Sequence, residues 1–162
     1  MEQRIDWDWL EELCRMFRSA PLMKLLEIEI SFDAEARAHF KLAFHPRLCH
    51  TLGDVHGGIY AMLLDNAGWF TVAGRYPGFW VATSELHTYL LEPARGEDME
   101  AVGRIVRLGK KIAVAESELF SASGRLLGKG IGSFLVLKGV PYEHQKVLQR
   151  LEELYQRFNW RI

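Results

Sequence analysis

HGGIYAMLLDNAGWF, at residues 56–70, is the stretch of sequence that decides the fold. From Ile59 to Ala73 nearly every residue is apolar and no face is left for water, which predicts a helix buried on all sides. The run is too short to span a membrane, and Asp65 lies in its middle. An ionised carboxylate in an apolar helix costs several kcal/mol unless donors or a partner compensate. Asp65 is therefore the residue that needs a functional explanation.

Two glycines precede this helix. Gly57 and Gly58 allow another molecule to approach the backbone closely, and they leave the first N–H groups of the helix uncovered. A buried acid and an uncovered helix N-terminus on the same central helix indicate a reaction site.

Length and composition limit the classes of protein to consider. A chain of 162 residues predicts a single domain, 1–162, with a substantial core. The formal net charge of −1, with acids and bases interspersed, does not favour nucleic-acid binding. Cys14 and Cys49 form no disulfide framework, and the N-terminus has no apolar signal-peptide region, so we expect a cytoplasmic protein.

The segments on either side of the helix have the patterns of strands. Two runs precede it and four follow it: 22–32, 36–44, 79–91, 98–108, 112–121 and 126–137. Short polar or glycine-containing connections at 109–111 and 121–124 predict hairpins, and hence a mainly antiparallel sheet with a four-stranded meander. A helix without a polar face needs a sheet curved around it, so the fold class is α+β.

Amphipathic helices are predicted at both ends, at about 6–18 and 142–159, around a core at about 20–139. The exposed charges of the second helix are mixed in sign. Packing on the domain or on a sister subunit therefore fits this helix better than membrane contact.

The central motif resembles that of a known family. Gly53-x-x-His56-Gly57-Gly58, followed after five residues by Leu64-Asp65, resembles the signature of hotdog acyl-CoA thioesterases of the phenylacetate-pathway type. The segments 83–94, 107–111 and 124–130 resemble the family's third strand, basic hairpin and last turn and strand, so that about 20–139 is covered. The resemblance implies the hotdog fold.

The resemblance also implies roles for individual residues. The Gly57 N–H would polarise the thioester carbonyl, Asp65 would activate water or attack directly, and Thr83 would support Asp65. His50 stands where the family commonly has Asn, and His87 stands where Asn is frequent. His50 could hold water or the thioester oxygen, or it could face solvent; for His56, orienting the loop or capping the helix is favoured over catalysis.

The spacing of Gly57 and Asp65 predicts an oligomer. Eight residues of helix separate them, roughly 12 Å at 1.5 Å per residue. Reacting groups must lie within about 3–3.5 Å of each other. One chain therefore cannot place both groups around one carbonyl. If both act, two central helices must run antiparallel across a two-fold axis, in a homodimer or tetramer with composite sites at the interface.

Other residues are candidates for substrate binding. Gly58, Ala61, Met62, Gly68 and Trp69 are expected on the helical face of Asp65. Met62 and Trp69 could line an acyl slot beside Gly58, or this face could be a subunit seam without ligand.

A basic hairpin and the histidines complete the candidate residues. Arg107, Lys110 and Lys111 are placed to meet the CoA phosphates, or they form a solvated hairpin tip. The histidines have no spacing typical of metal ligands, so no metal is expected. No cofactor is expected beyond the CoA thioester, which is the substrate.

The function that fits these features is an acyl-CoA thioesterase acting on an acyl- or aryl-CoA. A hotdog enoyl-CoA hydratase would need a His about one helical turn after Asp65, and 66–73 contains none. The alternative of a catalytically inactive module that binds acyl-CoA is favoured by the presence of His50 at the position where the family commonly has Asn. The retention of Asp65 argues against it, because replacing a buried acid would add stability.

Overall fold

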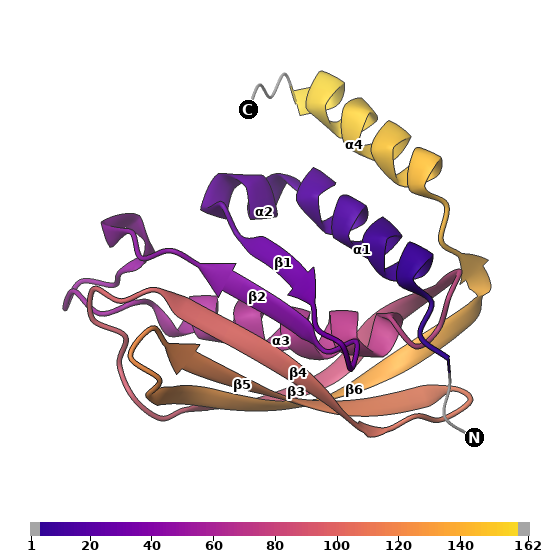
Figure 1. Ribbon diagram of the computed structural model, residues 1–162. Coiled ribbons are helices and arrows are strands. Elements are labelled where there is room, and N and C mark those ends of the chain that lie inside the picture. The colour runs from indigo at the N-terminus through magenta and orange to yellow at the C-terminus, as the bar shows by residue number, and fades with distance from the viewer. Residues whose placement is uncertain (1–3, 159–162) are drawn as a thin grey trace.

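Helix α3 (Gly57–Ala73) lies against one side of a curved antiparallel sheet in the computed structural model, which describes residues 4–158 (Figure 1). Over that range six strands form a sheet of order β1-β2-β4-β5-β6-β3. The strands are β1 (Glu29–Phe32), β2 (Ala38–Leu42), β3 (Phe79–Leu90), β4 (Met99–Arg107), β5 (Ile112–Ser121) and β6 (Leu126–Pro141). The α+β architecture of a sheet curved around a central helix is confirmed.

The strand order differs from a four-stranded meander. Of the four strands after α3, only β4, β5 and β6 follow one another through hairpins, whereas β3 pairs with β6 and forms an edge of the sheet. Pairing of β3 ends at the Glu92-Pro93 sequence, because proline has no N–H to donate to a neighbouring strand. The chain then crosses to the other part of the sheet, where β4 pairs with β2. The predicted meander is therefore wrong for β3.

Glycines in the sheet allow α3 to approach it closely. A Cβ atom at Gly103 of β4 would collide with the carbonyl oxygen of Ala67 in α3. A Cβ atom at Gly130 of β6 would lie 3.2 Å from the Cβ atom of Leu64. Leu64 and Ala67 are fully buried as a result, and this contact fixes α3 on the sheet.

One strip of α3 remains partly accessible in the single chain. Its members follow helical spacing and are Gly58, Ala61, Met62, Asp65, Asn66 and Trp69, called here the α3 strip. The prediction of a helix buried on all sides is therefore wrong for one chain, because the sheet and α1 cover only the other faces. Gly68 is not on the face of Asp65, because its α-carbon packs towards Phe134 of β6.

The run 22–32 is not one strand. Residues Pro21–Leu26 form the short helix α2, and only Glu29–Phe32 belongs to the sheet. Pro21 occupies the first turn, where its fixed φ suits a helix, and the following Leu, Met and Lys residues are good helix formers. Glu27 ends the helix with a left-handed backbone, at φ 55°.

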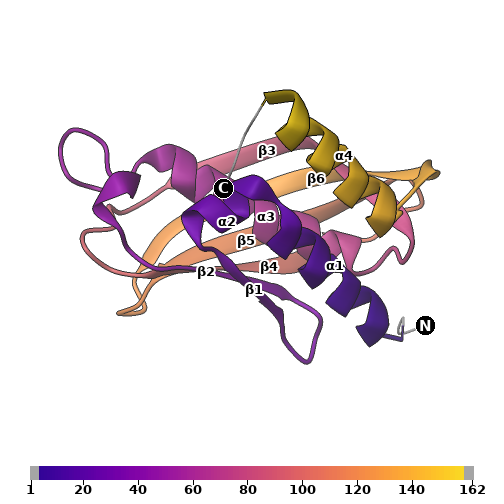
Figure 2. The ribbon, with the colours of Figure 1, turned by 90° about the horizontal axis from the view of Figure 1, so that it is seen from above.

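The terminal helices lie on the same side of the sheet as α3 (Figures 1 and 2). Helix α1 (Trp7–Ser19) begins after Asp6, whose carboxylate accepts the N–H of Trp9, and the Trp9 indole donates to the carbonyl of Ala73. Helix α4 is His144–Phe158; residue 159 of the predicted helix lies outside the described residues. In the described part of the chain, no helix has the length and apolar character that a membrane crossing requires.

Candidate active site

Asp65 and Thr83 form a pair between α3 and β3. The hydroxyl of Thr83 donates a hydrogen bond to Oδ1 of Asp65 at 2.9 Å. Burial raises the pKa of Asp65 above its usual value, and the hydrogen bond from Thr83 opposes that shift. A carboxylate with a raised pKa is suited to accept a proton at neutral pH.

The N-terminus of α3 is capped by His56. Its Nδ1 atom accepts the N–H of Gly58 at 2.9 Å, which fixes the entry into the helix. The N–H of Gly57 begins the helix and has no acceptor among residues 4–158. It is therefore available as a donor, with the positive end of the helix dipole behind it.

Gly57 lies in an open groove of about 220 Å³, called here the Gly57 groove. Its lining comprises His50, Asp54, Val55, Gly57, Tyr60 and residues 90–93. Leu90 packs so closely over Gly57 that a Cβ atom there would lie 2.7 Å from its Cδ1 atom. A side chain at position 57 would therefore displace the end of the Leu90 side chain.

His50 and Gly57 therefore line the same groove. The Nδ1 atom of His50 accepts the N–H of Leu52 at 3.1 Å. In the neutral ring this bond leaves the proton on Nε2, so His50 carries an N–H donor there. A donor N–H is a property that His50 shares with the side-chain amide of Asn.

Tyr60 and Leu90 shape this groove and were missed in the sequence. The Tyr60 hydroxyl donates to the carbonyl of Glu92 at 3.0 Å and accepts the N–H of Ala94 at 2.6 Å. These bonds hold the segment after β3 against the first turns of α3. A tyrosine inside an apolar helix was the available signal, because a buried hydroxyl needs a partner.

Asp65 does not line the Gly57 groove. Gly57 and Asp65 stand eight residues apart on the continuous helix α3, roughly 12 Å along its axis. The single chain thus brings Asp65 and Thr83 together, and His50 and Gly57 together, but leaves the two pairs apart.

The basic hairpin lies at the opposite end of α3 from Gly57. Tyr76, just after the helix, donates its hydroxyl to the carbonyl of Gly109 in the β4–β5 turn at 2.7 Å. Arg107, Lys110 and Lys111 around this turn are exposed. No ion pair within the described chain involves these three side chains, so they are free to meet an anion.

The other expected substrate contacts lie along the α3 strip. Gly58 is next to Gly57, Met62 packs partly on the core, and Trp69 lies about two helical turns beyond Met62. The Trp69 indole N–H donates to the carbonyl of Val81, and its ring packs edge-on against Trp80. These contacts fix the orientation of the Trp69 side chain on the α3 strip.

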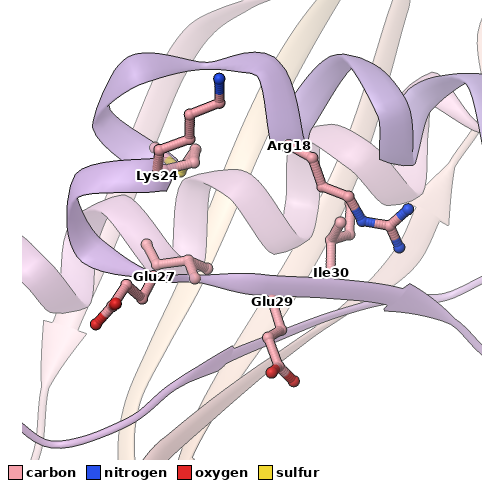
Figure 3. Close-up of a pocket in the computed structure, with 7 residues that line it drawn as sticks. Arg18, Lys24, Glu27, Glu29 and Ile30 are labelled. Atoms are coloured by element: carbon pink, nitrogen blue, oxygen red, sulfur yellow. The ribbon is translucent and has the colours of Figure 1, made fainter. Parts of the chain in front are cut away.

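A separate cavity of about 490 Å³ opens between α1, α2 and β1 (Figure 3). Arg18, Lys24, Glu27 and Glu29 line it, but their charged groups point in different directions and do not converge. None of the expected site residues lines this cavity. Among residues 4–158, no group of three or more His, Cys, Asp or Glu side chains is placed to hold a metal ion.

Comparison with known proteins identifies the family. The family model described as the thioesterase superfamily matches residues 52–127. A protein of Halobacterium salinarum named as a candidate esterase is 32% identical, over 72% of this chain and 85% of its own length. This chain belongs to the thioesterase superfamily. The matched segment contains Gly57, Asp65, Thr83 and the basic hairpin, and the esterase name of the relative supports hydrolase activity.

Solved structures agree with the fold. The BH2602 protein of Bacillus halodurans, solved with CoA, is 33% identical, with a TM-score of 0.71 over 82% of this chain and 88% of that one. The PaaI protein of the E. coli phenylacetic acid degradation operon is 18% identical and shares the fold, with a TM-score of 0.75 over 83% of this chain and 96% of that one. The predicted hotdog fold and thioesterase family are confirmed.

Proposed function

We propose that this protein hydrolyses the thioester of an acyl- or aryl-CoA. The observation that carries the proposal is the hydrogen-bonded pair of Asp65 and Thr83 on the central helix and its neighbouring strand. A half-buried acid with a raised pKa weakens the fold, so its presence on the central helix points to a function. The binding of CoA by the 33% identical Bacillus halodurans protein supports CoA as the thiol.

The chemistry follows from the donors and the acid. The Gly57 N–H, and the Nε2–H of His50 in the same groove, would stabilise the negative charge that develops on the thioester oxygen. Asp65 would take a proton from the attacking water while that water bonds to the carbonyl carbon. The C–S bond then breaks, the thiolate leaves and is protonated, and a carboxylic acid is released. Direct attack by Asp65, followed by hydrolysis of an anhydride, uses the same positions.

The separation of Gly57 from Asp65 requires two chains in this mechanism. Two α3 strips that pack antiparallel across a two-fold axis would place Asp65 of one copy near Gly57 of the other. The small side chains of Gly58 and Ala61 allow a second helix to pack closely against the strip. The free edge of β3 lies on the sheet beside it. The proposed mechanism therefore requires a homo-oligomer, either a homodimer or a tetramer.

The same arrangement gives the basic hairpin a role. The hairpin is fixed near the C-terminal end of its own α3. In an antiparallel pair with Asp65 of one copy near Gly57 of the other, that end extends roughly 12 Å beyond the other copy's Gly57, because Ala73 follows Asp65 by eight residues. Arg107, Lys110 and Lys111 of one copy would then meet the phosphates of a CoA whose thioester lies at Gly57 of the other copy.

A thiol-release assay tests the activity. Purified protein is given a panel of short-chain, long-chain and aromatic CoA thioesters, with Asp65→Asn as the matched control. Release of CoA by the wild type, and its loss in the variant, supports the proposal. Binding of these CoA thioesters without release would instead identify an acyl-CoA-binding module, the function that His50 in place of Asn favours.

A further inference from the structure

Strand β3 changes its facing direction part-way along its length. Residues an even number apart in a regular strand share a face, so Thr83 and Leu90, seven apart, would point to opposite sides. Yet Thr83 donates to Asp65 of α3, and Leu90 packs over Gly57 of the same helix. Both residues therefore face α3.

The pairing of β3 with β6 explains this. Thr83 is paired with Phe134, which is fully buried, and Glu85 is paired with the next residue, Ser133. Ser84 is thus an extra residue, a β-bulge, and the facing pattern is reversed beyond it. Leu90 consequently pairs with Gly128, whose α-carbon faces Tyr60 and Leu64.

The side chain of Ser84 holds the bulge in place. Its hydroxyl donates to the carbonyl oxygen of Ser133 at 2.9 Å. A bulge interrupts the ladder and leaves backbone groups without their regular partners. The Ser84 hydroxyl bonds to a carbonyl of the opposite strand at this point, one residue from Thr83.

We infer that Ser84 is a positioning residue: its bulge, fixed on Ser133, directs Thr83 at Asp65 and Leu90 at Gly57. The inference rests on the proposed function for its catalytic consequence, whereas the effect on Asp65 does not depend on any substrate. The Ser84 hydroxyl bonds to Ser133, whereas the hydroxyl that bonds to Asp65 is that of Thr83, so Ser84 acts on the acid through Thr83. A regular strand would instead turn Glu85, His87 and Tyr89 towards the helix.

The test compares three variants. Ser84→Ala removes the hydroxyl, Ser84→Thr retains it, and Ser133→Ala is the control because its carbonyl acceptor is main chain. Loss of one neutral hydrogen bond corresponds to roughly 2–10-fold in an equilibrium or rate. We expect kcat of Ser84→Ala to fall by that factor with KM unchanged, and Ser84→Thr and Ser133→Ala to behave as wild type.

The proton affinity of Asp65 separates positioning from simple stabilisation. Weakening of the Thr83 bond should move the titration of Asp65, followed by its ¹³C carboxyl signal, to higher pH in Ser84→Ala but not in Ser133→Ala. An unchanged titration and kcat in Ser84→Ala, even with a lower melting temperature, would overturn the inference. Failure of the wild type to release CoA from any thioester would overturn the proposed function alone, because the titration needs no substrate.

Discussion

The hydroxyl of Thr83 on β3 donates to Oδ1 of Asp65 on α3 at 2.9 Å, which ties the central acid to the edge strand of the sheet. Burial and this bond act on the acid in opposite directions: burial raises the pKa of Asp65, and the Thr83 bond lowers it. Thr83 therefore regulates how readily Asp65 accepts a proton, besides orienting its carboxylate.

Asp65→Asn should abolish most of the activity and preserve the fold. Hydrolysis should fall by roughly 10²–10⁴, the usual contribution of a positioned base, and further if Asp65 is the nucleophile. Affinity for CoA thioesters should change little, because Gly57 and the basic hairpin remain. Steady-state kinetics and binding by calorimetry measure the two effects, and wild-type turnover in this variant would exclude Asp65 from catalysis.

The same variant should be at least as stable as the wild type at neutral pH. The folded state raises the pKa of Asp65, so ionisation above that pKa favours the unfolded chain. Below the unfolded pKa of about 3.9 the acid is protonated in both states, and the difference should vanish. Denaturant unfolding at several pH values measures it; a variant that is less stable at pH 7 would mean that the charged form stabilises the fold.

Thr83→Val should shift the pH dependence of the reaction. Valine has a similar shape but no hydroxyl, so the bond that lowers the pKa of Asp65 is lost. The acid limb of kcat/KM should move to higher pH, because the base must be deprotonated to act. Thr83→Ser retains the donor and should keep the wild-type profile. An identical acid limb in all three proteins would show that this limb does not report Asp65.

Neutralising the basic hairpin should weaken binding but not chemistry. Replacement of Arg107, Lys110 and Lys111 by Gln removes charges that are expected to meet phosphates far from the carbonyl. Such contacts act alike on ground and transition states, so KM should rise while kcat stays nearly constant. Raising the ionic strength should raise the wild-type KM more than that of the variant. A fall in kcat with unchanged KM would remove these residues from the nucleotide site.

Asp33 should stabilise the fold at neutral pH and lose this effect in acid. Partial burial alone would raise the pKa of Asp33, but hydrogen bonds from the Arg37 N–H, from His39 and from the Arg37 side chain lower it to about 2. Because the folded-state pKa lies below the unfolded one, this stabilisation is full above pH 4 and is lost as pH falls towards 2. Asp33→Asn should cost roughly 2 kcal/mol at pH 7 and much less at pH 2. Urea unfolding measures both values, and an equal cost at the two pH values would contradict the assignment.

Much of this arrangement could be predicted from the sequence, because strong patterns determine it. The apolar run around Asp65 predicted α3, and alternating residues predicted the positions of most strands. The glycines before the helix indicated an open N-terminus, which the structure has at Gly57.

The rest depends on contacts that a sequence pattern does not contain. The apolar run at 22–32 suited either a strand or a helix, and packing on the core decided for α2. The pairing of β3 with β6 and the bulge at Ser84 are tertiary features, so the meeting of Leu90 with Gly57 could not be foreseen. The exposure of the α3 strip was missed because its apolar members, Ala61, Met62 and Trp69, look like core residues in the sequence, although Asp65 and Asn66 lie on the same strip.

The two-chain site can be tested through Gly57 without disturbing the helix. Proline fits the first position of a helix and lacks an N–H, and the extended backbone of His56 is compatible with a following proline. Gly57→Pro therefore removes the donor. Gly57→Ala is the control for the displacement of Leu90, because it adds a Cβ atom but keeps the N–H.

The most direct test of the account is the activity of a purified heterodimer of one Asp65→Asn chain and one Gly57→Pro chain, isolated through two different tags. Each parent should be almost inactive. If the acid and the donor come from different chains, one site of the heterodimer carries both lesions and the other carries neither. Activity should then recover to about half that of the wild type. A folded heterodimer as inactive as its parents would contradict the two-chain site.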